Sequence, residues 1–170
     1  MKDMIDVLEL LTSQHDEVDQ LIEQIESGDG DRAALFADLA DKLAAHATVE
    51  EKIFYPAAME QQTSEMLHEA VEEHLAIKRL IADLLELDPR DLDDQDEFEA
   101  KISLLKEQVS HHAREEEEGK LFPLLRTLMS EDERAALGNE VMAMFELVIE
   151  EEPRRQVPSE TAEAAPLPRL

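Results

Sequence analysis

The stretch Ser110–Pro123, SHHAREEEEGKLFP, decides the fold of this 170-residue chain. It contains two adjacent histidines, four consecutive glutamates and a closing Phe-Pro pair. The stretch His46–Pro56, HATVEEKIFYP, has the same order: a histidine, a glutamate four residues later, and an aromatic residue followed by proline. Because residues four apart lie on one face of a helix, each stretch directs an imidazole and a carboxylate at the same point. We therefore expect two helices that bring these two stretches face to face.

The composition favours helices over strands. Hydrophobic residues make up 43% of the chain and charged residues 35%, whereas aromatic residues are only 4% and no Val/Ile/Thr-rich alternating run occurs. This mixture is typical of amphipathic helices. The length is enough for one domain with a buried core. The sequence therefore predicts an all-α fold.

The formal net charge of −27 excludes several classes of partner. Nucleic acids and anionic membranes both require a basic face, which this chain lacks. The chain has no cysteine, so disulfides and thiolate metal sites are excluded. Asp3, Asp6 and Glu9 interrupt the apolar start that a secretion signal would need, and no apolar run approaches the roughly 20 residues of a membrane helix. We expect a soluble, cytoplasmic protein.

Apolar residues recur at steps of three and four along most of the chain, which predicts helices. The expected helices span residues 3–27, 31–61 with a kink at Pro56, 64–87, about 91–129 and 130–150. Short connections between long helices predict an antiparallel up-down-up-down four-helix bundle with a short fifth C-terminal helix. We expect residues 1–152 to form this bundle, and the proline-rich residues 153–170 to form a disordered tail.

Each of the first four predicted helices carries a histidine on its apolar face, and two of them add a glutamate four residues later. A lone histidine in such a place is usually a satisfied core residue, and a buried carboxylate needs counter-charge. Four histidines in phase with their apolar stripes indicate shared metal ions instead. The candidate ligands are His15, His46, Glu50, His74, His112 and Glu116.

Imidazole nitrogen and carboxylate oxygen without sulfur suit iron or manganese, with zinc as a competitor. Six protein ligands are too many for one tetrahedral zinc ion, and two carboxylates that can bridge favour two ions. The HExxH pattern of metalloproteases is absent, and the Glu-x-x-His scheme of ferritin-like bundles does not match. We expect two non-haem iron ions, with manganese or zinc as alternatives.

The ordered set H…HxxxE…H…HxxxE over about residues 5–150 resembles the hemerythrin-like (HHE cation-binding) family. The resemblance implies a non-haem diiron site inside an antiparallel bundle, with Glu50 and Glu116 bridging the ions and the histidines as terminal ligands. Oxygen-carrying hemerythrins have a second histidine four residues after the third-helix ligand, and that position is Lys78 here. The site is therefore expected to be more open or differently filled. Tyr55 is a candidate for the vacancy, as a phenolate ligand or hydrogen-bond donor, with ordinary packing as the alternative.

The two stretches differ in length after their glutamates: Glu50 is six residues before Pro56, whereas Glu116 is seven residues before Pro123. A π-bulge near Gly119 would absorb the extra residue. A bulge between the ligands would instead replace Glu116 by Glu117, and we favour Glu116.

Two further histidines lie off the apolar stripes. His111 is turned about 100° from His112 and is a candidate partner behind the ligands. His68 is expected to be exposed to solvent.

Two functions follow from an open diiron site. The first is an oxidoreductase-like reaction with peroxide or dioxygen, for instance disproportionation of hydrogen peroxide. The second is non-enzymatic sensing, storage or transport of oxygen, nitric oxide or iron. A metal-free interaction bundle is the third alternative. In the first two cases the partners are small molecules, with no nucleic acid and no membrane.

Overall fold

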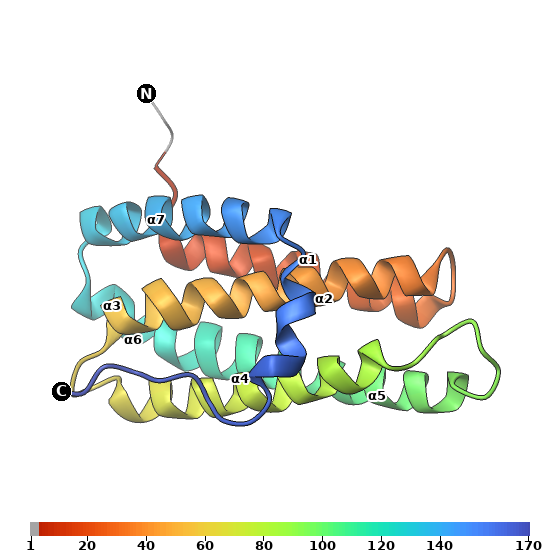
Figure 1. Ribbon diagram of the computed structural model, residues 1–170. Helices are drawn as coiled ribbons and strands as arrows, with labels where there is room; N and C mark the ends of the chain where they lie inside the picture. Colours follow the sequence, from red (N-terminus) through yellow and green to blue (C-terminus); the bar gives the residue numbers. More distant parts are fainter. Residues whose placement is uncertain (1–3) are drawn as a thin grey trace.

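The computed structural model describes residues 4–170, and every regular element in that range is helical (Figure 1). The elements are α1 (Val7–Ser27), α2 (Arg32–Val49), the π-helix η1 (Glu50–Phe54), α3 (Tyr55–Ala58), α4 (Ser64–Leu85), α5 (Gln95–Ser110), the π-helix η2 (His111–Leu121), α6 (Phe122–Leu128), α7 (Glu131–Glu150) and the 3-10 helix η3 (Pro153–Glu160). The predicted all-α fold class is confirmed. The predicted first residue of the first helix, Asp3, lies outside the described residues.

Local side-chain caps set where several helices begin and end. The Asp6 carboxylate accepts the Leu8 N–H at 2.8 Å at the start of α1, and Gly28, with φ +77°, ends the same helix. Ser130 and Glu133 form the predicted capping box at the start of α7. These signals lie within a few residues of each other, so the sequence alone reveals them.

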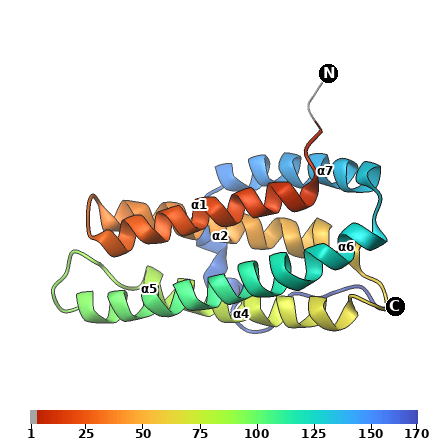
Figure 2. The ribbon, with the colours of Figure 1, turned by 180° about the vertical axis from the view of Figure 1, so that it is seen from behind.

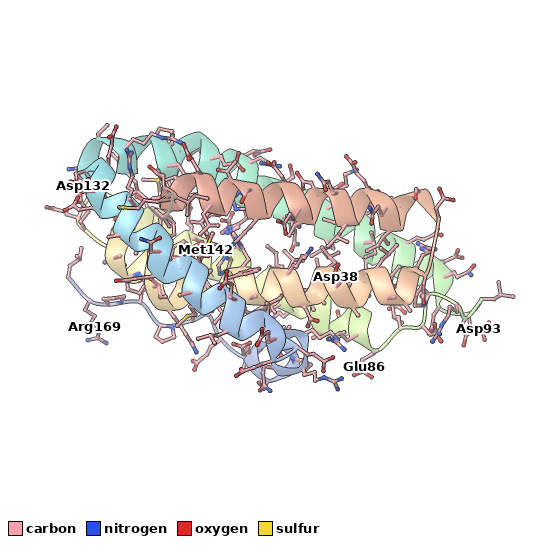
Figure 3. All side chains as sticks on the ribbon, turned by 90° about the horizontal axis from the view of Figure 1, so that it is seen from above. Asp38, Glu86, Asp93, Asp132, Met142 and Arg169 are labelled. Atoms are coloured by element: carbon pink, nitrogen blue, oxygen red, sulfur yellow. The ribbon has the colours of Figure 1, made fainter. Side chains whose placement is uncertain are left out.

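The helices are arranged in pairs (Figures 1 and 2). α1 lies beside α2, and α4 lies beside α5 and its continuation through η2. α7 runs obliquely across the outside of α1 and α2 (Figure 3). No helix among residues 4–170 is long and apolar enough to cross a membrane.

The apolar core is divided into two clusters, and the polar site lies between them. One cluster contains Val18, Phe36 and Phe98, and the other contains Leu11 and Phe122. Burial of each such side chain contributes about 1.5–3 kcal/mol, which offsets the cost of placing charged groups in the interior. On α1, the site histidine falls between Leu11 of one cluster and Val18 of the other.

Both prolines of the two related stretches follow a π-helix. Proline has no N–H and its ring crowds the preceding turn, so the helix before it must adjust. The Tyr55 N–H bonds to the Glu50 carbonyl and the Phe122 N–H to the Glu117 carbonyl, each five residues back. The hydrogen-bond pattern therefore widens before Pro56, where a kink was expected, and the helical segment continues without a break to Ala58 rather than Gln61.

The chain after α7 differs from the expected disordered tail. Residues 153–160 form η3, whose Val157 is fully buried in the core. The Arg154 guanidinium also pairs with Asp41 at 2.7 Å. Residues after η3 run back along α4 (Figure 1). The composition of the tail predicts disorder because apolar residues are few, but one well-placed valine and a partly buried ion pair attach it to the helices. The division of the chain at residue 152 stays a prediction.

Candidate metal centre

Five of the six predicted ligands meet in the interior, each from a different helix. His15 comes from α1, His46 from α2, Glu50 from η1, His74 from α4 and His112 from η2, and all are between 0 and 6% exposed. They form two groups of ligand atoms that share the Glu50 carboxylate.

The first group lies between α1, α2 and η2. The His15 and His46 Nε2 atoms are 3.2 Å apart, and His46 Nε2 is 3.0 Å from Glu50 Oε1. Glu117 completes the group, with Oε1 3.3 Å from His15 Nε2. Neighbouring ligand atoms on a metal ion with bonds of about 2.0–2.2 Å lie about 3 Å apart, so this spacing fits one ion.

The second group lies between η1, α4 and η2. The His74 and His112 Nε2 atoms are 3.0 Å apart, and His74 Nε2 is 3.2 Å from Glu50 Oε1. Glu117 Oε1 is 3.4 Å from His112 Nε2 as well as close to the first group. Both carboxylates therefore lie between the two groups, where a bridging ligand would be.

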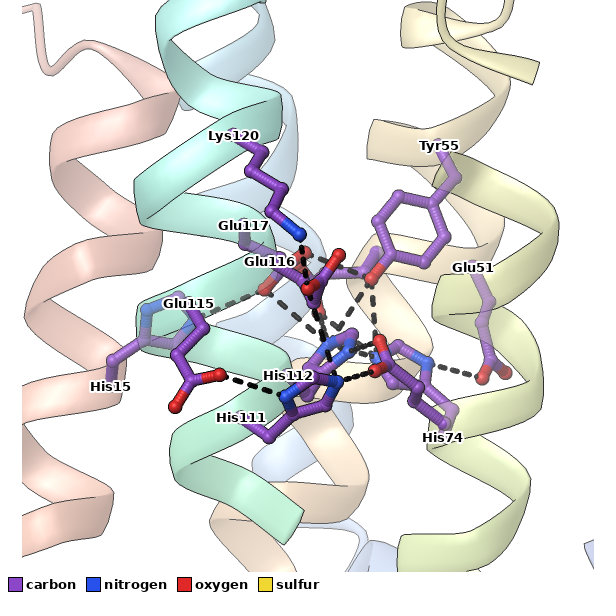
Figure 4. Close-up of polar contacts among 12 residues, drawn as sticks. His15, Glu51, Tyr55, His74, His111, His112, Glu115, Glu116, Glu117 and Lys120 are labelled. Atoms are coloured by element: carbon purple, nitrogen blue, oxygen red, sulfur yellow. Dashed lines mark hydrogen bonds and ion pairs between the residues drawn. The ribbon is translucent and has the colours of Figure 1, made fainter. Parts of the chain in front are cut away.

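Glu117 belongs to the first group of ligand atoms, whereas Glu116 belongs to neither group and contacts Lys120 (Figure 4). Glu117 is 1% exposed, whereas the Glu116 carboxylate pairs with Lys120 at 2.8 Å on the outer side of η2. Glu116 therefore does not lie with the other five predicted residues, whereas the alternative, Glu117, does, and the ligand role of either residue stays a prediction. The reason is the π-helix: η2 already begins at His111, so the residue that returns to the face of His112 is five positions later and not four.

A polar side chain behind each imidazole sets its orientation. Every Nδ1 atom faces an acceptor oxygen, which makes Nδ1 the protonated nitrogen and leaves the Nε2 lone pair directed inward. The pairs are His15 with Glu118 at 2.7 Å, His46 with Gln14 at 2.6 Å, His74 with Glu51 at 2.7 Å and His112 with Glu73 at 2.9 Å.

The inward side of the cluster consequently consists of acceptors. Glu50 Oε2 and Glu117 Oε1 are buried without a hydrogen-bond donor. Buried oxygens of this kind are rare and costly, and lone pairs about 3 Å apart repel one another. The donor set therefore fits cations at its centre.

Burial and the neighbouring carboxylates also shift the pKa values of the residues in the cluster. Burial by itself lowers the pKa of His112, but Glu117 and Glu50 outweigh it and hold that pKa well above its usual range. The neighbouring carboxylates also outweigh burial at His15 and His74 and raise both pKa values. Burial raises the pKa of Glu117, and repulsion from Glu50 adds to this shift. Without metal, the carboxylates thus favour positive charge on these three histidines.

Tyr55 contacts the second group directly. Its side chain is fully buried, and its hydroxyl donates to Glu117 Oε2 at 2.9 Å. The Tyr55 hydroxyl oxygen also lies 3.3 Å from the Nε2 atoms of both His74 and His112 (Figure 4). Burial and the nearby carboxylates raise the pKa of the Tyr55 phenol well above its usual value. The phenol oxygen thus has the spacing of another ligand atom.

Lys78 lies four residues after His74, where oxygen-carrying hemerythrins have a second histidine. It is 7% exposed, and its Nζ lies 2.9 Å from Glu51 Oε1. Glu51 in turn accepts from His74 Nδ1, so the lysine neutralises the carboxylate that orients this imidazole.

The two remaining histidines lie outside the centre. His68 is exposed, as expected. His111 is half exposed and pairs with Glu73 at 3.0 Å, the same carboxylate that orients His112. His111 therefore lies behind a predicted ligand, as its neighbouring position had indicated.

Sequence reasoning missed the four side chains that orient the imidazoles. Each is the sequence neighbour of a centre residue but serves a histidine on another helix: Gln14, Glu51, Glu73 and Glu118. An acidic or amide residue beside four of the six centre residues was a readable signal, but which histidine it reaches depends on helix packing.

The sequence around Glu117 also contained a signal for its position that was missed. Comparing the two stretches backwards from their prolines aligns EEKIFYP (50–56) with EEGKLFP (117–123) without a gap. This alignment pairs Glu50 with Glu117 and moves the extra residue to the interval between histidine and glutamate.

Comparison with known proteins gives two matches. The family model described as hemerythrin HHE cation binding domain matches residues 6–125. The crystal structure of a hemerythrin HHE cation binding domain-containing protein from Mycobacterium kansasii, an Rv2633c homologue, is similar with a TM-score of 0.75 and 22% identity, covering 93% of this chain and 95% of that one. No curated protein sequence matches the chain.

Proposed function

This chain belongs to the hemerythrin HHE cation binding domain family, and from this premise we propose that it is a two-iron protein that reacts with hydrogen peroxide or dioxygen. The family and the His/Glu cluster together support metal binding. The proposal of two iron ions and of their reaction rests on the arrangement of the ligand atoms. The observation that carries it is the pair of ligand groups joined through one buried carboxylate.

The proposed ligands follow the two groups. The first ion would be held by His15, His46 and the two carboxylates, and the second by His74, His112 and the same two carboxylates. Glu50 and Glu117 are the bridging ligands in this proposal. Nitrogen and oxygen ligands without sulfur favour iron or manganese, with zinc as a competitor.

Tyr55 is the proposed additional ligand of the second ion. Its hydroxyl oxygen lies 3.3 Å from the Nε2 atoms of His74 and His112. Neighbouring ligand atoms around the second ion lie 3.0 to 3.4 Å apart, so the spacing is the same. Tyr55→Phe tests this role: the iron(III)-loaded variant should lose the visible absorption of an iron-bound phenolate while keeping its iron. Unchanged visible absorption and unchanged metal geometry would end the proposal for Tyr55.

A small apolar cavity beside the cluster supports a reaction with small molecules. It measures about 30 Å³ and is lined by the four histidines together with side chains such as Ile81 and Val109. A hollow of about 10–15 Å³ already admits one water molecule, so this cavity has room for a molecule of the size of dioxygen or peroxide. Iron bound at the neighbouring His/Glu cluster would supply electron transfer and open coordination positions. The apolar walls of the cavity keep bulk water away from it.

The proposal includes the surrounding architecture, an up-down-up-down four-helix bundle with α7 as a fifth helix. The contacts of α1 with α2 and of α4 with α5 support it, as does the short turn between α1 and α2. We further propose a cytoplasmic location, because a cysteine-free acidic chain suits that compartment.

Metal analysis is the first test. Protein expressed in iron-replete medium should contain about two iron ions per chain, one for each ligand group. Less than about one metal ion per chain would refute the proposal, since more than half of the ligand groups would then be empty. With iron present, oxygen evolution after addition of peroxide supports the enzymatic reaction. A stable oxygen or nitric oxide adduct without oxygen evolution would instead support sensing or transport.

A further inference from the structure

Two hollows lie on either side of one lysine side chain. The inner hollow is the apolar cavity of about 30 Å³ beside the cluster. The outer hollow is a groove of about 390 Å³ between η1 and the C-terminal segment, lined by Glu51, Lys52 and residues of 159–166. Lys78 lines both hollows. Its side chain therefore stands between the metal centre and the groove.

Two carboxylates that line the groove hold the lysine. Nζ lies 2.9 Å from Oε1 of Glu51, on η1, and 3.9 Å from Oε1 of Glu160, in the C-terminal segment. The Glu51 side chain is 9% exposed, whereas that of Glu160 is 42% exposed. A lysine stem has four rotatable carbons, so its ammonium can turn towards the groove without moving the backbone. Such a rotation would change both contacts, and the contact with Glu160 is the longer of the two.

The outer wall of the groove is a covering segment, residues 159–166, attached on both sides. Val157 is buried in the core just before it, and Arg79 Nε donates to the Thr161 carbonyl at 3.0 Å within it. Leu167 packs against the second apolar cluster just after it. Figure 1 shows this part of the chain lying along α4. The covering segment thus has fixed ends and carries Glu160 over Lys78.

We propose that Lys78 and the covering segment form the gate of the metal centre, through which small neutral molecules pass between the groove and the inner cavity. Glu160 holds the Lys78 side chain in the closed position. The inference rests on the proposed function only in assuming that a reactive small molecule must reach the cluster.

Charge and volume define which molecules pass. The groove carries three carboxylates, Glu51, Glu160 and Glu163, against two ammonium groups, Lys52 and Lys78. This excess of negative charge disfavours anions, and the apolar inner cavity adds a desolvation cost for any ion. The fitting class is therefore neutral molecules of two to a few heavy atoms, such as dioxygen, nitric oxide and hydrogen peroxide.

A lysine with a purely structural role would have different measurable effects from a gate. Lys78 neutralises Glu51, which orients His74, so a structural lysine would affect metal affinity and thermal stability. A gate affects the rates of binding and release together and leaves the affinity for the small molecule unchanged, because it acts on the path and not on the bound state.

The first experiment uses the full-length, iron-loaded protein in its reduced state and measures nitric oxide association and dissociation by stopped flow. In Lys78→Ala both rates should rise about tenfold with the affinity within about twofold, and in Glu160→Gln both should rise about two- to threefold. Glu160→Gln keeps the Glu51 pair, so it remains informative if Lys78→Ala loses metal. Lys101→Ala, a surface lysine on α5 paired with Asp83, is the matched control and should not change either rate.

The second readout needs no iron. Tyr55 is the only tyrosine and the chain has no tryptophan, so its fluorescence reports from the centre itself. In the zinc-loaded full-length protein, dynamic quenching of this fluorescence by dissolved oxygen should increase in Lys78→Ala and Glu160→Gln, whereas quenching by iodide should not.

The gate is refuted if both variants retain metal and show rates and oxygen quenching within about twofold of the unaltered protein. The gate is also refuted if Lys78→Ala loses metal while Glu160→Gln matches the unaltered protein in both readouts. If the unaltered chain binds no iron, the proposed function fails, but the oxygen quenching still decides whether Lys78 controls access.

Discussion

Replacing Glu117 by glutamine, with Glu116→Gln as the matched control, tests the register of the η2 ligand. The two residues are adjacent, have the same chemistry, and differ only in the side of the π-helix to which they point. Glu117 Oε1 lies 3.3 and 3.4 Å from imidazole nitrogens of the two ligand groups. Glu116 instead pairs with Lys120 on the surface. Glutamine keeps the volume and removes the charge, so each variant removes one carboxylate with little change in packing.

The structure sets the expected magnitudes. Loss of a residue that merely orients a ligand costs about 10–100-fold in metal affinity, so loss of a carboxylate shared by both ions should cost at least about 100-fold. This factor corresponds to about 2.8 kcal/mol at 1.4 kcal/mol per tenfold. With metal in excess, stability falls by the same amount, which lowers the Tm of a chain of this size by roughly 5–11 °C. An exposed i,i+4 pair such as Glu116–Lys120 is worth about 0.3–0.5 kcal/mol, so Glu116→Gln should change the Tm by no more than about 2 °C.

The assay is a competition titration of ferrous iron between each variant and a chelator of known affinity, together with thermal unfolding in excess iron. The opposite order, with Glu116→Gln losing metal and Glu117→Gln retaining it, would falsify the assignment of the ligand. Equal and small effects of both variants would show that neither carboxylate holds the ions.

Three further outcomes are expected. Glu51→Gln should lower metal affinity about 10–100-fold without removing a ligand, because Glu51 orients His74 through Nδ1, and the same chelator titration measures this. The difference in Tm between metal-loaded and metal-free protein should widen from about pH 6 to about pH 8, measured by calorimetry, and a constant difference would contradict the reasoning. The pKa of His112 is raised in the folded chain, so its stabilising contribution without metal is complete below about pH 6.5 and is lost as the pH rises through the raised pKa, whereas metal binding needs the neutral imidazole. Val157→Ala should destabilise the protein by roughly 1–3 kcal/mol in denaturant unfolding, whereas Leu170→Ala should change stability by less than about 0.5 kcal/mol. Equal effects of these last two variants would mean that η3 does not pack on the core.

Several features of the fold could be predicted because their causes are local. The spacing of apolar residues marks each long helix, and the Ser130–Glu133 capping box marks the start of α7. The four histidines were found because each lies in phase with the apolar stripe of its own helix. Five of the six predicted ligands meet in the centre for this reason.

The remaining features depend on groups that are far apart in the chain. The tail has the composition of a disordered segment, and only the space left between α2 and α4 makes burial of Val157 favourable. The acceptors behind the imidazoles are set by helix packing, since Glu73 beside His74 serves His112 and not its neighbour. No pattern within one helix contains this information.

The stretch 110–123 shows where the sequence by itself was sufficient and where it was not. Its residues alone determined that a helix would carry a histidine and a glutamate into the core, because an α-helical or π-helical turn both return to the same face. The choice between Glu116 and Glu117 was decided only by the tertiary structure. A residue four positions after His112 faces inward on an α-helix, and a residue five positions after it faces inward on a π-helix. The position of the wide turn depends on how Pro123 and its neighbours fit against the helices around them.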